Sequence, residues 1–421
     1  MFQWERLCAQ NSAQVALVEG TLDADLVEGA WQSTLRDMGL GRVHLSEEGY
    51  SHEIWSGEPA APLVTHFTNA GSIERFLEME LNRPFPATPA MPYRPFAMQH
   101  ADGCYLGVVF QQWLADSVSI RLMMREWFVR IFAPQKARRK LIDLPRPRIA
   151  RGPRLTFGPR DMFRTAREFW NWSHNVRRLA RYPAGTDDNQ MILRPITLPS
   201  VDVDRLLLVT RAEGCTVNDL LIALVATTLR GELTGEPTGG AKGGAEVSGN
   251  VAIATSIDLR PYLPGDLGET FGSLLAYAPV ICPMPQENIL NLAQEVARQT
   301  RRIKDPERIA SKLVIPRMVA WWMAGKRPEL LPDLYTRHIP VAAAVSNVNL
   351  NKAWPAVYSP SPIRRYLRVA APGPAVPLSI TATTLGETLD IMFSARRGVV
   401  SEAMADRIAG GFAQTLQALL Q

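Results

Sequence analysis

The sequence predicts an α/β protein built of two lobes. An order of strand, turn, strand and helix occurs on both sides of one Pro-rich, basic segment, and such a repeat indicates two layered units joined by a connector. The 421 residues are 46% hydrophobic and 21% charged. A chain of this length and composition buries a large core without disulfides and is not disordered as a whole.

The first lobe is expected to contain a hairpin followed by a helix. Residues 97–112 predict strand, turn and strand, and the pair Asp102-Gly103 suits a tight hairpin turn. Within them, residues 106–110 form an uninterrupted apolar strand. Residues 118–132 then place apolar side chains at helical spacing, so a helix is expected directly after the hairpin.

The second lobe is expected to begin its core with a capped helix. Thr216 and Asp219 have capping-box spacing ahead of the apolar residues 220–229, which predicts a long buried helix. Capping explains both residues without a catalytic role. The other elements expected here are buried strands at 251–257 and 341–345, a hairpin of 378–384 and 388–394 around Gly386, and a last helix that Ser401 caps and that runs towards Leu419.

A basic segment from Lys136 to Arg181 separates the two lobes. It holds fourteen Lys and Arg against three acidic residues, a net charge of +11, whereas the whole chain carries only +5. Its prolines between residues 143 and 154 exclude regular helix and strand, so this part is a connector. The predicted domains are an N-terminal lobe of residues 1–135, a connector with an amphipathic helix at 136–190, and a C-terminal lobe of residues 191–421.

Residues 161–181 alternate apolar and basic side chains at helical spacing, which leaves two interpretations open. In the first, a crossing helix packs its aromatic residues on the body and turns its arginines to water. In the second, the helix is a docking surface for an anionic partner, with an acidic carrier protein, a phosphorylated cofactor and a membrane surface as candidates. No nucleic-acid motif accompanies the charge, so nucleic acid is not expected as a partner.

Several other classes are disfavoured. In the Gly-rich residues 235–249, Lys242 is followed by glycine and not by Ser or Thr, which predicts a surface loop and not a phosphate loop. No Cys or His cluster suggests a metal, and no nucleophile elbow of the form G-x-S-x-G occurs. The four cysteines form no close pair, no apolar run reaches about 18 residues and no signal sequence is evident, so a reduced, cytoplasmic protein is expected.

The segment Gln111-Gln-Trp-Leu-Ala-Asp-Ser117, between the apolar strand and the amphipathic helix, resembles a known motif. It is similar to the His-His-x-x-x-Asp-Gly motif of the CoA-dependent acyltransferase superfamily. That superfamily includes chloramphenicol acetyltransferase, peptide-synthetase condensation domains and wax ester synthase/diacylglycerol acyltransferases. Segments that resemble the wax ester synthase-like branch follow in the same order at residues 216–224, at residues 256–261 with Phe271-Gly272, and at residues 345–348, although Asn349 replaces a proline.

The resemblance implies two chloramphenicol acetyltransferase-like lobes in a V-shaped pseudodimer, each a mixed sheet with flanking helices. A tunnel from each face would reach the motif at the lobe interface. One would admit an acyl thioester, with acyl-CoA or a phosphopantetheinyl acyl-carrier protein as co-substrate and no bound cofactor, and the other a small-molecule hydroxyl or amine acceptor. In the family, the second His takes the acceptor's proton, and the Asp is chiefly structural and commonly pairs with an Arg.

This chain departs from the motif at the position of the histidine that acts as general base. Gln111 and Gln112 occupy the two His positions and Ser117 the Gly position, so that only Asp116 matches. A glutamine amide is not a base near neutral pH, although it donates and accepts hydrogen bonds. A general base contributes about 10²–10⁴ in rate, but reactant positioning and oxyanion donors act without one. Gln111, Gln112 and Asp116 are the candidate catalytic residues.

Four interpretations of Gln112 remain: it orients an acceptor that is already nucleophilic, another group serves as base, the site performs different chemistry, or the protein is a pseudoenzyme. His338 is the histidine best placed as a substitute base, because it precedes the strand that leads to the Ser-Asn segment. The other five histidines are expected to be structural or solvated. Substrate contacts are expected from His338, Ser117, Ser119, Ser346 and Asn347.

The favoured function is transfer of an acyl group from CoA or a carrier protein to a hydroxyl or amine, in secondary-metabolite or lipid biosynthesis. The main alternative is a catalytically silent, condensation-like module that docks a carrier protein or partner enzyme on Lys136–Arg181. A third hypothesis is a lipid-handling protein that contacts the membrane surface through the basic aromatic helix.

Overall fold

The computed structural model describes most of the chain. The ranges are 8–46, 49–53, 62–68, 72–86, 90–139, 159–176, 179–183, 185–233, 249–263, 266–284, 288–306, 327, 330, 334, 337–353, 362–373 and 376–421. The Pro-rich part of the connector and nearly all of the Gly-rich residues 235–249 lie outside the described residues.

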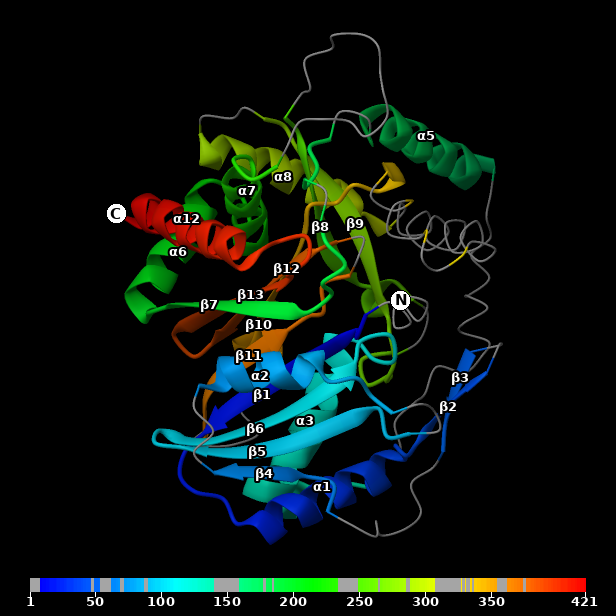
Figure 1. Ribbon diagram of the computed structural model, residues 1–421, viewed down its shortest axis with the longest axis vertical. Coiled ribbons are helices and arrows are strands. Elements are labelled where there is room, and N and C mark those ends of the chain that lie inside the picture. Colours follow the sequence, from blue (N-terminus) through cyan, green and yellow to red (C-terminus); the bar gives the residue numbers. More distant parts are fainter. Residues whose placement is uncertain are drawn as a thin grey trace.

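A five-stranded mixed sheet forms the first lobe, in the lower half of Figure 1. The strand order is β11-β1-β6-β5-β4; β4 runs parallel to β5 and the other neighbours are antiparallel. The predicted hairpin is confirmed, with His100 paired to Gly103. The elements are β1 (Asn11–Val18), α1 (Ala24–Met38), a small hairpin of β2 (Val43–Ser46) and β3 (Gly49–His52), β4 (Thr65–Thr68), α2 (Ile73–Asn82), β5 (Tyr93–His100), β6 (Gly103–Gln111), α3 (Ser117–Phe132) and η2 (Pro134–Lys136).

A six-stranded mixed sheet forms the second lobe, in the order β7-β13-β12-β10-β8-β9. β10 runs parallel to both β12 and β8, while the remaining pairs are antiparallel. The elements are β7 (Met191–Leu198), α6 (Ser200–Ala212), α7 (Val217–Leu229), β8 (Val251–Asp258), η3 (Arg260–Tyr262), β9 (Leu275–Cys282), α8 (Ile289–Ile303), β10 (Ala343–Asn349), α11 (Leu350–Ala353), β12 (Leu378–Leu385), β13 (Thr388–Arg396) and α12 (Glu402–Leu420).

α7 is the central helix of the second core. The capping box predicted from Thr216 and Asp219 is present in both directions, the Thr216 side chain accepting from the Asp219 N–H and the Asp219 carboxylate from the Thr216 N–H. Residues 220–226 are fully buried against the sheet, α8 and α12. A helix that is apolar all round belongs in a core, which explains why its sequence shows no polar face.

One strand of the C-terminal half belongs to the first sheet. β11 (Ile363–Val369) pairs antiparallel with β1, although the sequence assigned residues 191–421 to the second lobe as a unit. The pairing covers an edge that β1 would otherwise expose. β11 also lies against β12 and β13 of the second sheet, where the Arg368 guanidinium reaches the Ala382 carbonyl at 2.7 Å. The other predicted domain limits stay a prediction.

The basic helix α5 (Pro159–Val176) is present, but it does not bury all its aromatic residues. Phe163 and Trp170 are 71% and 73% exposed, whereas Trp172 donates its indole N–H to the His338 carbonyl. The expectation that these aromatics pack on the body therefore fails at two positions. Among the described helices, no single one has the length and hydropathy of a membrane span; only α6 and α7, taken together across a bend of 97°, meet that criterion.

Candidate functional site

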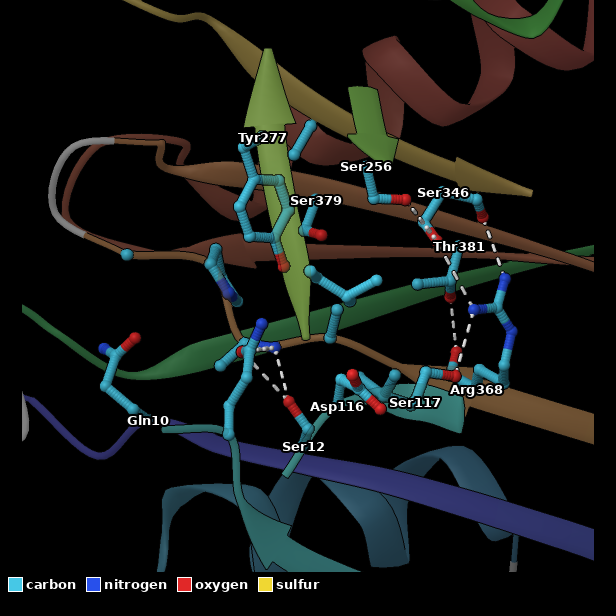
Figure 2. Close-up of a pocket in the computed structure, with 18 of the residues that line it drawn as sticks. Gln10, Ser12, Asp116, Ser117, Ser256, Tyr277, Ser346, Arg368, Ser379 and Thr381 are labelled. Atoms are coloured by element: carbon cyan, nitrogen blue, oxygen red, sulfur yellow. Dashed lines mark hydrogen bonds between the residues drawn. The ribbon is translucent and has the colours of Figure 1, made fainter. Parts of the chain in front are cut away.

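A cavity of about 250 Å³ lies where the two lobes meet (Figure 2). Its walls come from β1, the end of β6 and the start of α3 on one side, and from β8, β9, β10 and β12 on the other, with β11 between them. The predicted site residues that line it are Gln112, Asp116, Ser117 and Ser346. Those that do not are Gln111, Ser119, Asn347 and His338.

Gln112 is held in one orientation. Its Oε1 accepts hydrogen bonds of 3.0 Å from the Ser12 hydroxyl and from the backbone N–H of Ala371. A backbone N–H can only donate, so the amide oxygen must face Ala371 and the amide N–H group must face the other way. Gln112 therefore presents hydrogen-bond donors, and no basic atom, on its remaining side.

Tyr277 is the partner of Gln112 on the opposite wall. It comes from β9 of the second lobe and points into the cavity in Figure 2. Its hydroxyl interacts with the Gln112 side chain. Desolvation raises the pKa of Tyr277, and the Gln112 amide only partly opposes this, so the hydroxyl is neutral near pH 7. Sequence reasoning missed Tyr277. The available signal was an aromatic residue on the more exposed face of a strand whose side chains alternate between buried and exposed.

Gln111, the neighbour of Gln112, does not reach the cavity. It is the last residue of β6, is buried and pairs with Asn11 of β1. Successive side chains of a strand point to opposite faces, which explains why only one of the two glutamines lines the cavity. The catalytic role expected for Gln111 is therefore not supported by its position.

Asp116 joins the two lobes, and both of its carboxylate oxygens accept hydrogen bonds. It caps α3 by accepting from the Ser119 N–H at 2.9 Å, and its other oxygen accepts from the Leu274 N–H at 2.8 Å. Arg260 contacts both carboxylate oxygens, at 2.9 and 3.1 Å, and both side chains are buried. The expected pairing of the motif Asp with an Arg is thus observed. A carboxylate held in this way is a structural clamp, because all its contacts fasten α3 to the second lobe.

Ser119 extends this clamp and is not a substrate contact. Its hydroxyl lies 2.9 Å from both Asp116 Oδ1 and the Gly272 carbonyl, and it accepts from the Gly272 N–H and from Arg260. The residue is fully buried. The substrate-binding role expected from its place beside the motif is therefore replaced by a role in holding the segment around Gly272.

Arg368 is the second residue that sequence reasoning missed. It comes from β11, is 3% exposed and lines the cavity. Its guanidinium donates to the Thr383 hydroxyl at 2.9 Å and to the carbonyls of Ser346 and Ala382 at 2.9 and 2.7 Å, and it lies 3.3 and 3.4 Å from the hydroxyls of Ser117 and Ser346 (Figure 2).

Two of the expected substrate-contact serines flank that guanidinium. Ser117 is held from β1, where Gln14 donates to its carbonyl at 2.9 Å and to its hydroxyl at 3.2 Å. Ser346 lies 3.2 Å from the Ser256 hydroxyl of the neighbouring strand. Asn347, the next residue, points away from the cavity by strand alternation, and its side-chain oxygen is buried without a hydrogen-bond partner in the part of the chain that the structure describes.

No histidine lines the described cavity, so the substitute base expected at His338 is not placed there. The carbonyl of His338 instead contacts Trp172 of α5. The titratable side chains in the described lining are Asp116, Tyr277 and Arg368. Because Asp116 is locked in its ion pair, this wall supplies hydrogen-bond donors and one cation, but no free base.

The chain matches no family model and no curated protein. Solved structures do match. The first condensation domain of the CDA synthetase is 15% identical, with a TM-score of 0.70 over 98% of this chain and 91% of that one. The epimerization domain of the third module of tyrocidine synthetase B is 15% identical, with a TM-score of 0.63 over 99% and 93%. The starter condensation domain of rhizomide synthetase, in complex with C8-CoA and Leu-SNAC, is 13% identical, with a TM-score of 0.64 over 98% and 89%.

These likenesses extend over both lobes and nearly the whole length of each chain. The protein therefore has the two-lobed, mixed α/β fold of condensation domains, which confirms the fold expected from the sequence. The fold by itself does not decide the reaction, since one fold hosts many chemistries.

Proposed function

We propose that the protein transfers an acyl group from a thioester to an amine acceptor in the interlobe cavity. The donor is an acyl-CoA or an acyl chain on a phosphopantetheinyl carrier protein. The observation that carries the proposal is the fixed orientation of Gln112, whose amide N–H group faces away from Ala371 and towards Tyr277. The condensation-domain fold supports it, because this chain shares that architecture over nearly its whole length.

In this reaction the amine lone pair attacks the thioester carbonyl carbon. The C–N bond forms as the carbonyl electrons move to oxygen, and Gln112 and Tyr277 donate hydrogen bonds to that oxyanion. The C–S bond then breaks, the thiolate leaves, and the proton released from nitrogen passes to the thiolate through solvent. The cavity holds the two reactants together, which supplies rate without a base.

The absence of a free base in the described lining favours an amine over a hydroxyl acceptor. A neutral amine attacks before it loses a proton, whereas a hydroxyl needs proton removal as it attacks. Gln112 is a donor in this geometry and cannot take that proton.

The test is thiol release by the purified protein with a panel of acyl-CoAs and acyl-carrier proteins and a panel of amines and alcohols. Gln112→Ala is expected to lower release with amines by about 10²-fold, the effect of one lost oxyanion donor. Gln112→His restores the family base and is expected to create release with alcohols, because a general base is worth about 10²–10⁴.

Gln294→Ala, at an exposed helix position whose side chain meets Glu213, is the control and is expected to leave release unchanged. Equal rates in wild type and Gln112→Ala would overturn the role of Gln112. No release from wild type or from Gln112→His with any pair would overturn the transferase.

A second candidate is a catalytically silent module that docks a carrier protein. It is favoured by the lack of a free base in the described cavity and by the exposed Phe163 and Trp170 on the basic helix α5. It predicts binding of an acyl-carrier protein that weakens with salt, that Trp170→Ala and Arg167→Glu reduce, and that occurs without thiol release.

A further inference from the structure

Arg368 is a buried cation with no carboxylate partner. All its hydrogen bonds go to carbonyl and hydroxyl oxygens, and no described Asp or Glu accepts one from it. Neutral acceptors compensate a buried charge only in part, and proteins normally pair such a charge. An uncompensated guanidinium that faces a cavity is therefore a place where a ligand can supply the missing negative charge.

The charges around it do not balance Arg368. The ionisable groups that act on its charge are Arg121, a second cation, and Tyr366. Arg121 is in turn surrounded by Asp116, Arg260 and Asp258, so that two cations there offset two carboxylates. Burial and the repulsion from Arg121 lower the pKa of Arg368 to about 9, which still leaves it charged at neutral pH.

The hydroxyls beside Arg368 also have hydrogens to donate. The Ser117 hydroxyl accepts from Gln14 and from Arg368, and no described group accepts its hydrogen. Gln14 is fixed as a donor, because its N–H group also bonds the Ser117 carbonyl while its oxygen accepts from Tyr366.

The hydroxyls of Ser256 and Ser346 also have a hydrogen to donate. Ser256 and Ser346 share one hydrogen bond, and the Ser346 oxygen also faces the Arg368 guanidinium. One of the two hydroxyl hydrogens is therefore left without an acceptor among the described groups. Together with Ser117, two O–H donors converge beside one cation, and all four side chains line the same cavity (Figure 2).

We propose that Arg368, Ser117 and the Ser256–Ser346 pair form an anion-binding subsite, and that a substrate entering the cavity carries a carboxylate there. One guanidinium and two hydroxyl donors match the single charge and two oxygens of a carboxylate. A phosphate monoester carries close to two charges and three acceptor oxygens, for which one cation is too few. The inference rests on the cavity being the substrate site of the proposed function.

The test measures binding of butyrate, a one-carboxylate probe, to the full chain by calorimetry and by thermal shift. Its neutral isostere butyramide and inorganic phosphate are the comparison probes. Butyrate is expected to bind and to raise the melting temperature, butyramide to bind at least tenfold more weakly, and phosphate to bind less well than butyrate. Arg368→Leu is expected to lose butyrate binding by more than tenfold.

Arg364→Leu is the matched control, because Arg364 lies on the same strand but is exposed and pairs with Glu19. It is expected to bind butyrate as wild type does. Ser117→Ala removes one O–H donor with little change to the fold and is expected to weaken binding several-fold, so the inference stays testable if Arg368→Leu does not fold. Equal binding of butyrate and butyramide, or full binding by Arg368→Leu, would overturn the subsite; a preference for phosphate would overturn the carboxylate.

The binding measurement and the transfer measurement can overturn their two proposals independently of each other. Butyrate binding that depends on Arg368, without any thiol release, would leave the subsite standing and remove the proposed reaction. Thiol release without butyrate binding would leave the proposed reaction standing and remove the subsite.

Discussion

Two buried arginines at the lobe interface have opposite surroundings. Arg260 meets a carboxylate at both of its terminal nitrogens and donates as well to Ser119 and to the Thr270 carbonyl. Arg368 meets only neutral oxygens and faces the cavity. The difference separates two uses of a buried charge: a compensated pair fastens the lobes, whereas an uncompensated cation leaves electrostatic attraction for a ligand.

The compensated pair extends into a clamp between the lobes. Asp116 and Ser119 come from the first lobe, while Arg260, Gly272 and Leu274 come from the second. Phe271, in the same segment, is buried in the core of the first lobe and meets Tyr93 edge-on. The one intact residue of the family motif thus serves the fold.

The largest effect is expected from breaking this clamp. Asp116→Ala removes the buried partner of Arg260, leaves it the half-exposed Asp258 as its remaining described carboxylate partner, and is expected to lower the free energy of unfolding by about 3–5 kcal/mol. Urea unfolding followed by fluorescence measures it. Asp25→Ala, at an exposed helix position, is the control and is expected to stay within about 0.5 kcal/mol. A loss below about 1 kcal/mol for Asp116→Ala would contradict the clamp.

Replacing Arg368 is expected to lower the free energy of unfolding by less than replacing Arg260. Arg260→Leu leaves the Asp116 charge unpaired and is expected to cost about 3–5 kcal/mol. Arg368→Leu loses hydrogen bonds but also removes an uncompensated charge, so its cost is expected to stay below about 2 kcal/mol. The same urea titrations give both values. A cost for Arg368→Leu equal to that of Arg260→Leu would show that both arginines serve the fold.

The smallest effect on the free energy of unfolding is expected from two buried cysteines, and it appears only at alkaline pH. Burial raises the pKa of Cys104, in the first sheet, to about 11 and that of Cys282, in the second, to about 12. Unfolded thiols ionise near pH 9, so above that pH the unfolded state has released a proton that the folded state keeps. Their contribution to stability is complete below pH 9 and is lost as pH rises through 11 to 12.

Urea unfolding at pH 8 and pH 10 measures this loss. Cys104→Ala is expected to show a smaller decrease than wild type, on the order of 1 kcal/mol less per pH unit. Cys215→Ala, at a partly exposed site, is the comparison variant. Equal decreases in wild type and Cys104→Ala would contradict the assigned pKa of Cys104.

Local patterns in the sequence were enough for most elements. The Asp102-Gly103 turn, the box of Thr216 and Asp219 and the Ser401 cap all form as predicted, because a turn or a cap depends on residues a few positions apart. The motif segment also lies where the resemblance placed it, between a buried strand and a helix. Failures came where distant segments meet: β11 joins the first sheet, and Tyr277 reaches Gln112 from the other lobe.

The strand β11 shows where the sequence alone reaches its limit. Alternation places Arg364, Tyr366 and Arg368 on one face, and nothing in the pattern distinguishes the two arginines. In the structure Arg364 is exposed beside Glu19, while Arg368 is buried under β12 and pairs with no described carboxylate. The sequence by itself determined most of the elements and the two-lobe class. Only the tertiary structure decided which charges are compensated, since that depends on which segments of the two sheets cover each side chain.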